Sequence, residues 1–192
     1  YGYFPVQASG NDLIVYDPAA MRSDGGSMRE LTRFTFPRQE GREHLCLADY
    51  FRTVESGDVD VAAFQIVTLG DEATRRFETL QASGEYTEAY YLHGLGVEAA
   101  EATAEWMHQT IRRELGVPAT QGKRYSWGYP ACPDLEGHAQ LFRLLPAREA
   151  LGIELTSAFQ LTPEQSTAAI VVHHPEAKYY VIRGGAAETE AA

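Results

Sequence analysis

Residues 124–133 constrain the fold more than any other stretch, because they combine one glycine with two prolines. Pro130 and Pro133 each fix a backbone φ angle and lack an amide donor, and each biases the preceding residue toward an extended conformation. The segment therefore cannot form the interior of a helix, and it is a poor candidate for a central strand. We expect a rigid, irregular loop, which is a common place for ligand-binding groups.

Two residues of this loop suit an anionic ligand. Arg124 offers a planar guanidinium that can bind a carboxylate, and Gly128 lets a ligand approach the backbone closely. From these residues alone, an anion-binding site and a purely structural corner are equally good interpretations.

The motif Arg-x-x-x-Gly-Tyr-Pro-Ala-Cys-Pro in this loop closely resembles the signature of the activation domain of cobalamin-dependent methionine synthase, a binder of S-adenosylmethionine. The similarity extends over about residues 4–182 and includes a helical segment with Glu101, Glu105 and His108. Two departures stand out. Ser126 and Trp127 replace the Ala-Pro common in the family. Family members also carry an additional N-terminal segment, with an acidic residue that contacts the ligand, before the part that this chain resembles.

The resemblance implies how the ligand is held. The carboxylate of Glu101 accepts hydrogen bonds from the ligand's ammonium group while Arg124 binds its carboxylate, because an amino-acid zwitterion needs both charges. Without the resemblance, the face carrying Glu101, Glu105 and His108 would be interpreted as a solvated helix face. Paired tyrosines in a His-Pro-x-x-Lys-Tyr-Tyr segment contact the adenosine. The implied S-adenosylmethionine-binding residues are Glu101, Arg124, Gly128, Tyr129, Ala131, Tyr179 and Tyr180.

The resemblance also implies a function. The family's domain presents the methyl group of S-adenosylmethionine to cob(II)alamin for reductive remethylation, which reactivates a methyltransferase of methionine biosynthesis. Cobalamin is then carried by a neighbouring domain of the same polypeptide, and a flavodoxin-type protein donates the electron. The isolated domain needs no catalytic residue and is not expected to catalyse by itself. The alternative is a ligand-free interaction module that regulates a corrinoid protein.

Composition excludes several other classes of function. A net charge of −11 argues against binding to nucleic acid or to anionic membranes, both of which attract clusters of Lys and Arg. Two cysteines, Cys46 and Cys132, are too few for a disulfide framework and fit the cytoplasm. No metal site is expected, because no Cys or His stands at ligand spacing and the adjacent His173 and His174 would point to opposite sides of a strand. A thiol enzyme using Cys132 and His108 has no support from spacing.

The order of predicted elements indicates an α+β fold with a mixed, largely antiparallel twisted sheet flanked by helices. We expect a single activation domain over residues 1–183, shorter at its N-terminus than the family, and a flexible tail at 184–192. Ala100, Ala104, Met107 and Ile111 recur at helical spacing and predict a buried stripe. Strands are predicted at residues 1–7, 13–16, 31–36, 59–68, 156–161, 168–172 and 178–183. Helices are predicted from residue 71 with interruptions at Gly84, Gly94 and Gly96, most clearly at 98–115, and at 137–145 and 146–151.

Overall fold

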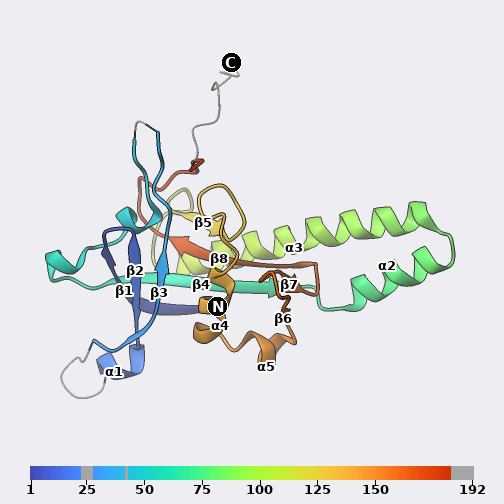
Figure 1. Cartoon of the computed structure of the whole chain (residues 1–192), viewed down its shortest axis with the longest axis horizontal. Coiled ribbons are helices and arrows are strands. Elements are labelled where there is room, and N and C mark those ends of the chain that lie inside the picture. The colour runs from blue at the N-terminus through green and yellow to red at the C-terminus, as the bar shows by residue number, and fades with distance from the viewer. Residues whose placement is uncertain (23–27, 42, 183–192) are drawn as a thin grey trace.

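The chain forms an α+β fold built on one six-stranded sheet, in a computed structural model that describes residues 1–22, 28–41 and 43–182 (Figure 1). The strand order is β3-β2-β1-β4-β8-β5, and every neighbouring pair is antiparallel. This confirms the predicted fold class. The strands of the large sheet are β1 (Gly2–Ser9), β2 (Asp12–Tyr16), β3 (Glu30–Thr35), β4 (Asp60–Thr68), β5 (Lys123–Ser126) and β8 (Ser166–Val172). A two-stranded sheet pairs β6 (Glu154–Leu155) with β7 (Leu161–Thr162).

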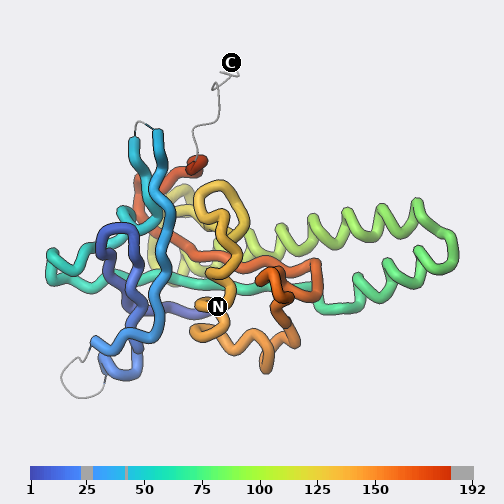
Figure 2. The backbone as a smooth tube through the Cα atoms, in the orientation of Figure 1, coloured from blue at the N-terminus to red at the C-terminus, as the bar shows by residue number. Residues whose placement is uncertain are grey.

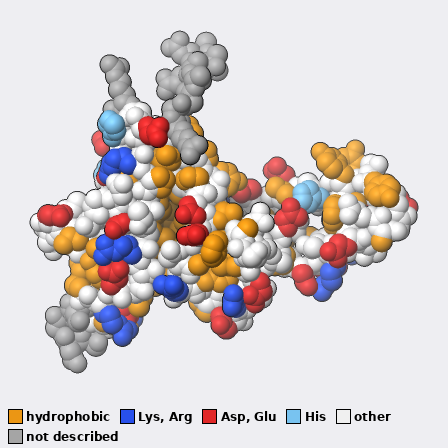
Figure 3. Space-filling model, in the orientation of Figure 1, with side chains coloured by type: hydrophobic (Ala, Val, Ile, Leu, Met, Phe, Trp, Pro, Cys, Tyr) orange, Lys and Arg blue, Asp and Glu red, His pale blue; other side chains and the backbone are white. Residues whose placement is uncertain are grey.

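Two helices form a hairpin that projects from the body of the molecule (Figures 1 and 2). They are α2 (Glu72–Ala82) and α3 (Tyr86–Glu114), and Gly84 permits the tight turn between them with a φ of 82°. Hydrophobic side chains gather near the far end of the hairpin (Figure 3), where Tyr90, Tyr91 and Leu95 are exposed. The remaining helices are α1 (Pro18–Arg22), α4 (Gly137–Leu144), α5 (Ala147–Leu151) and the 3₁₀ turns η1 (Leu47–Tyr50) and η2 (Val54–Ser56).

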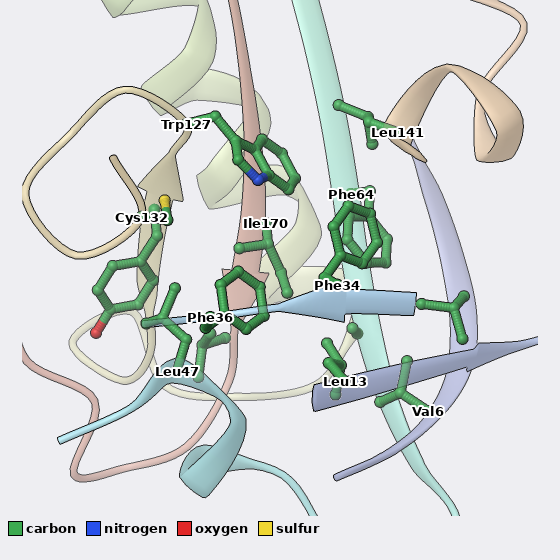
Figure 4. Packing of buried hydrophobic residues seen from close by; sticks show 14 of the residues in the cluster. Val6, Leu13, Phe34, Phe36, Leu47, Phe64, Trp127, Cys132, Leu141 and Ile170 are labelled. Carbon is green, nitrogen blue, oxygen red and sulfur yellow. The ribbon is translucent and has the colours of Figure 1, made fainter. Parts of the chain in front are cut away.

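The main hydrophobic core lies on one face of the sheet, where aromatic rings pack together (Figure 4). The Phe34 ring stacks on Phe64 with centroids 5.2 Å apart, and Trp127 lies 5.4 Å from Phe34. Leu141 of α4 is fully buried in the same cluster. This core fixes Trp127, and with it the start of the loop that follows β5.

The opposite face of the sheet is covered by the C-terminal half of α3. Ile111 packs against Ala63 and Val171, and Gln65 donates a hydrogen bond to the Ala104 carbonyl oxygen over 3.1 Å. Ala100, Ala104 and Ile111 are buried, as the helical spacing predicts, whereas Met107, the fourth residue of the predicted stripe, is only partly buried. This packing places α3 beside the edge of the sheet that β5 forms.

The predicted interruption of α3 is wrong, because the helix is continuous through Gly94 and Gly96. A glycine inside a helix costs only about 1 kcal/mol, which tertiary packing can offset. The Gln165 side chain packs closely beside Gly96, where a Cβ atom would lie only 3.0 Å from Cγ of Gln165. The helix therefore begins at Tyr86 and not near residue 98.

Three other expectations about local structure are corrected. Residues 156–160 form a turn between β6 and β7, so that only Leu161 of the predicted strand 156–161 lies in a strand, and residues 178–182 form no strand. The backbone of 178–182 bonds to loops and side chains instead, as when Ile182 donates to the Pro130 carbonyl oxygen. The segment 124–133 is also not wholly irregular, because Arg124 to Ser126 belong to edge strand β5. The expected tail at 184–192 lies outside the described residues.

Within the described part of the chain, no helix combines the length and apolar character needed to cross a bilayer. The same residues contain no group of three or more His, Cys, Asp or Glu side chains arranged to hold a metal ion.

Candidate functional site

A pocket of about 430 Å³ opens along the edge of the sheet that β5 forms. Its walls come from α3, from β5, from the loop after β5 and from the segment that follows β8. Six of the seven residues implied by the resemblance line this pocket, although they are spread over 80 positions of the sequence. They are Glu101, Arg124, Tyr129, Ala131, Tyr179 and Tyr180.

An ion pair joins two walls of the pocket. Arg124 Nη2 donates to Glu101 Oε2 over 2.8 Å, with the Arg124 side chain 14% exposed and the Glu101 side chain 40% exposed. No described residue donates a hydrogen bond to the other oxygen of Glu101. Arg124 Nη1 makes only a long contact of 3.4 Å with Ser126 Oγ. Both charged groups therefore retain capacity to bind a ligand.

Gly128, the seventh implied residue, does not line the pocket but shapes the loop that does. Its φ of 87° is unfavourable for any residue with a side chain, and a Cβ atom would lie 3.0 Å from Cδ2 of Leu135. The Gly128 amide donates to the Cys132 carbonyl oxygen over 2.9 Å, and the Cys132 amide donates to the Tyr129 carbonyl oxygen over 3.0 Å. This tight turn brings Tyr129 and Ala131 into the pocket wall.

The aromatic residues of the pocket differ in burial. Tyr129 and Tyr179 are 56% and 67% exposed, so their rings are available to a ligand or partner. Tyr180 is buried, burial raises its pKa, and its hydroxyl has no hydrogen-bond partner among the described residues. Tyr125 holds this segment in place, because its hydroxyl donates to the Lys178 carbonyl oxygen over 2.7 Å and its ring meets Tyr179 edge to face.

Glu105 and His108 do not join Glu101 in the pocket, although all three share a helix face. Glu105 Oε2 lies 3.3 Å from Nδ1 of His108, and Glu105 Oε1 accepts from Arg112 over 3.2 Å. His108 is buried, and burial together with the nearby Arg112 lowers its pKa. These residues form a polar cluster on α3, and of the three only Glu101 lines the pocket.

Cys132 lines the pocket but is not suited to be a nucleophile. Its side chain is buried, the thiol donates to the Ser126 carbonyl oxygen over 3.0 Å, and burial raises its pKa to about 12. A thiol at ordinary pH is then fully protonated and unreactive. The geometry agrees with a structural role for Cys132.

Sequence reasoning missed Ser126, which also lines the pocket. Alternate residues of a strand point to the same side of a sheet, so Arg124 and Ser126 share a side in β5. That signal was present, but it required recognising residues 123–126 as a strand. A second cleft of about 620 Å³ adjoins the pocket and shares Glu101 and Tyr129 with it.

The chain is similar in sequence to known proteins over nearly its whole length. The family model for the vitamin B12 dependent methionine synthase activation domain matches residues 1–188. A methionine synthase of Mycobacterium tuberculosis (strain ATCC 25618 / H37Rv) is 39% identical, and one of Mycobacterium leprae (strain TN) is 38% identical. Each alignment covers 94% of this chain but only 16% of the relative, so the chain spans about one sixth of their length.

The fold is also similar to a solved structure. A crystal structure of the MetH reactivation domain bound to AdoHcy superposes with a TM-score of 0.83 at 27% sequence identity. The superposition covers 94% of this chain and 59% of that one. Because the family model matches nearly all of the sequence, this chain belongs to the activation-domain family of vitamin B12 dependent methionine synthases.

Proposed function

We propose that the pocket at the edge of β5 binds S-adenosylmethionine. The observation that carries this proposal is the contact between Arg124 and Glu101, since it sets a cation and an anion 2.8 Å apart in the wall of one pocket. A ligand with both an ammonium and a carboxylate group finds a partner for each charge there. Charge-assisted hydrogen bonds of this kind are about twice as strong as neutral ones.

The remaining residues suit the nucleoside part of the same ligand. The Tyr179 ring is exposed at the pocket, and the Tyr129 ring stands on the loop beside it. Flat aromatic surfaces of this type favour contact with a purine ring. The similarity to a reactivation domain bound to AdoHcy supports the same assignment, because AdoHcy is S-adenosylmethionine without its transferable methyl group.

The domain then acts by presenting the ligand's methyl group to cob(II)alamin carried by another domain of the same polypeptide. The sulfonium is itself an activated leaving group, so the protein contributes position and orientation and no nucleophile. A flavodoxin-type protein supplies the electron that reductive remethylation requires. The outcome is reactivation of a methyltransferase that makes methionine, and the full-length methionine synthases among the relatives support this role. We expect Tyr129, which is 56% exposed beside the pocket, to face the partner domain.

Titration calorimetry of the chain with S-adenosylmethionine tests the binding step. We expect saturable binding at one site, with competition by S-adenosylhomocysteine. Binding that is absent from a fully folded chain would contradict the proposal and favour a ligand-free interaction module. The transfer step is tested by adding the ligand-loaded chain to a cob(II)alamin-loaded partner domain with a reductant and following methylcobalamin by absorbance.

A further inference from the structure

We propose that the hydroxyl group of Ser126 donates a hydrogen bond to the carboxylate of the bound ligand and so selects ligands that carry an amino-acid end. The inference rests on the proposed binding of S-adenosylmethionine in the same pocket.

The position of Ser126 places it at the charged part of the pocket. Ser126 lines the pocket and is 8% exposed, and it shares a side of β5 with Arg124. Arg124 Nη1 lies 3.4 Å from Ser126 Oγ, while Nη2 of the same guanidinium lies 2.8 Å from Glu101. An anion bound by Arg124 therefore comes close to the Ser126 hydroxyl.

The hydrogen-bond inventory of Ser126 leaves its proton free. A hydroxyl group has one proton to donate and two lone pairs that accept. Arg124 can only donate, so Ser126 Oγ accepts in that contact, and Thr167 Oγ1, 3.5 Å away, is too distant to hold the Ser126 proton in a strong hydrogen bond. Among the residues that the structure describes, none accepts a hydrogen bond from the Ser126 side chain.

The chemistry of the surroundings specifies what that proton binds. Both contacts to Ser126 Oγ are long, so small rotations of the hydroxyl cost little. The neighbouring guanidinium attracts an acceptor that carries negative charge. The ligand's carboxylate has two oxygens, and one can bind Arg124 while the other accepts from Ser126. A nucleoside without the amino-acid end, such as 5′-methylthioadenosine, cannot use either group.

The test compares Ser126→Ala with the wild-type chain for two ligands. S-adenosylhomocysteine carries the carboxylate and 5′-methylthioadenosine lacks the whole amino-acid end. We expect Ser126→Ala to weaken S-adenosylhomocysteine about tenfold, as for loss of one hydrogen bond to a charged group, and to leave the affinity for 5′-methylthioadenosine unchanged. Ser166→Ala is the matched control, because Ser166 bonds Thr68 over 2.8 Å and does not line this pocket.

Three outcomes overturn the inference. Unchanged affinity of Ser126→Ala for S-adenosylhomocysteine would show that the hydroxyl does not touch the ligand. Equal losses for both ligands would assign Ser126 a structural role instead. In either case wild-type binding leaves the proposed function intact, whereas a folded wild-type chain that binds neither ligand overturns both. If Ser126→Ala unfolds, Ser126→Thr, which keeps a hydroxyl group, is compared with Ser126→Val, which has nearly the same shape and no hydroxyl. Equal affinities of these two chains for S-adenosylhomocysteine would overturn the inference, and weaker binding by Ser126→Val alone, with equal affinities for 5′-methylthioadenosine, would support it.

Discussion

Arg124 Nη2 and Glu101 Oε2 lie 2.8 Å apart and connect the edge strand β5 to the middle of α3. The Arg124 side chain is mostly buried, whereas the Glu101 side chain is 40% exposed. Breaking such a pair leaves a partly buried charge without its partner, which is costly. The pair therefore connects the wall of the pocket to the packing of α3 on the sheet.

Replacing Arg124 with alanine should weaken binding of S-adenosylmethionine while the fold persists. The lost hydrogen bond to a carboxylate is worth about 1.5–3 kcal/mol, which corresponds to about tenfold or more in affinity. Calorimetric titration measures the loss, and circular dichroism confirms folding. Arg148→Ala serves as the control, because Arg148 forms an exposed ion pair with Glu154 away from the pocket. Wild-type affinity in folded Arg124→Ala would refute the role given to Arg124.

Glutamine at position 101 should reduce affinity more than glutamine at position 105. Glu101 lines the pocket, whereas Glu105 is occupied by His108 and Arg112. We expect Glu105→Gln to act on stability, because it weakens the contacts of a buried histidine. Paired measurements of affinity and thermal unfolding for the two variants separate these effects. A larger loss of affinity at position 105 would mean that the ligand contacts a different turn of α3.

The sequence predicted the fold class and six of the residues that line the pocket, for different reasons. The buried stripe of α3 followed from periodicity, since Ala100, Ala104 and Ile111 are all buried. The pocket residues came from the family resemblance of three separate segments, because nothing in local periodicity brings Glu101, Arg124 and Tyr179 together. Their proximity depends on β8 pairing with β5 and on α3 crossing the sheet.

Features that depend on tertiary contacts could not be predicted. Gly96 looks like a helix interruption until Gln165 is seen to occupy the space beside it. Residues 178–182 have the composition of a strand, but the edge of β8 is occupied by β5 and these residues pair with no strand of the sheet. Instead their backbone is held by single contacts, such as that from Tyr125 to Lys178. In each case a distant residue decides the local conformation.

His173 and Asp60 form an ion pair that should make stability depend on pH. His173 Nε2 lies 2.9 Å from Asp60 Oδ1. The hydrogen bond to Asp60 raises the pKa of His173 above its ordinary value of 6.5, although burial opposes the change. Burial also disfavours ionised Asp60, but hydrogen bonds from His173 and from backbone amides outweigh it and lower the pKa of Asp60 below 3.8.

The sign of each effect follows from linkage. The contribution of protonated His173 is complete below pH 6.5 and is lost as the pH rises through its raised folded-state pKa. The contribution of ionised Asp60 is complete above pH 3.8 and is lost as the pH falls through its lowered folded-state pKa. We expect chemical denaturation of His173→Gln to show a smaller fall in stability above pH 6.5 than the wild type shows. Identical pH profiles for the two proteins would contradict this role.

Two glycine-to-alanine substitutions should have opposite effects on stability. At Gly137 a Cβ atom would lie 2.0 Å from Nε1 of Trp127, whose ring is fixed by the core. Overpacking of this kind costs about 1–3 kcal/mol. At Gly94, inside α3, a Cβ atom would have no neighbouring atom within 4 Å, so alanine should stabilise the helix by about 0.5–1 kcal/mol. Urea denaturation of the two variants measures the change in the free energy of unfolding for each. A Gly137→Ala chain as stable as the wild type would show that Trp127 can move.

The isolated chain should bind S-adenosylmethionine but transfer no methyl group to homocysteine. In the proposed function the charged residues of the pocket hold the ligand's zwitterion, and Cys132 in the pocket wall is buried with its pKa raised to about 12. No group in the described part of the site is therefore suited to activate an acceptor. The acceptor is expected on a separate domain, and a domain cut from its polypeptide docks weakly because it loses the high effective concentration that a linker provides.

The measurement incubates the chain with S-adenosylmethionine and homocysteine and follows methionine by chromatography, first alone and then with a cob(II)alamin-loaded partner domain and a reductant. We expect no methionine above the uncatalysed rate in the first mixture. Methylcobalamin, followed by absorbance, should form only in the second mixture. Arg124→Ala, which should bind the ligand poorly, is the control for the second mixture, where it should slow the reaction at limiting S-adenosylmethionine. Methylation of homocysteine without any corrinoid would show that the chain is a methyltransferase in its own right. The homocysteine would then be expected in the cleft that shares Glu101 and Tyr129 with the pocket.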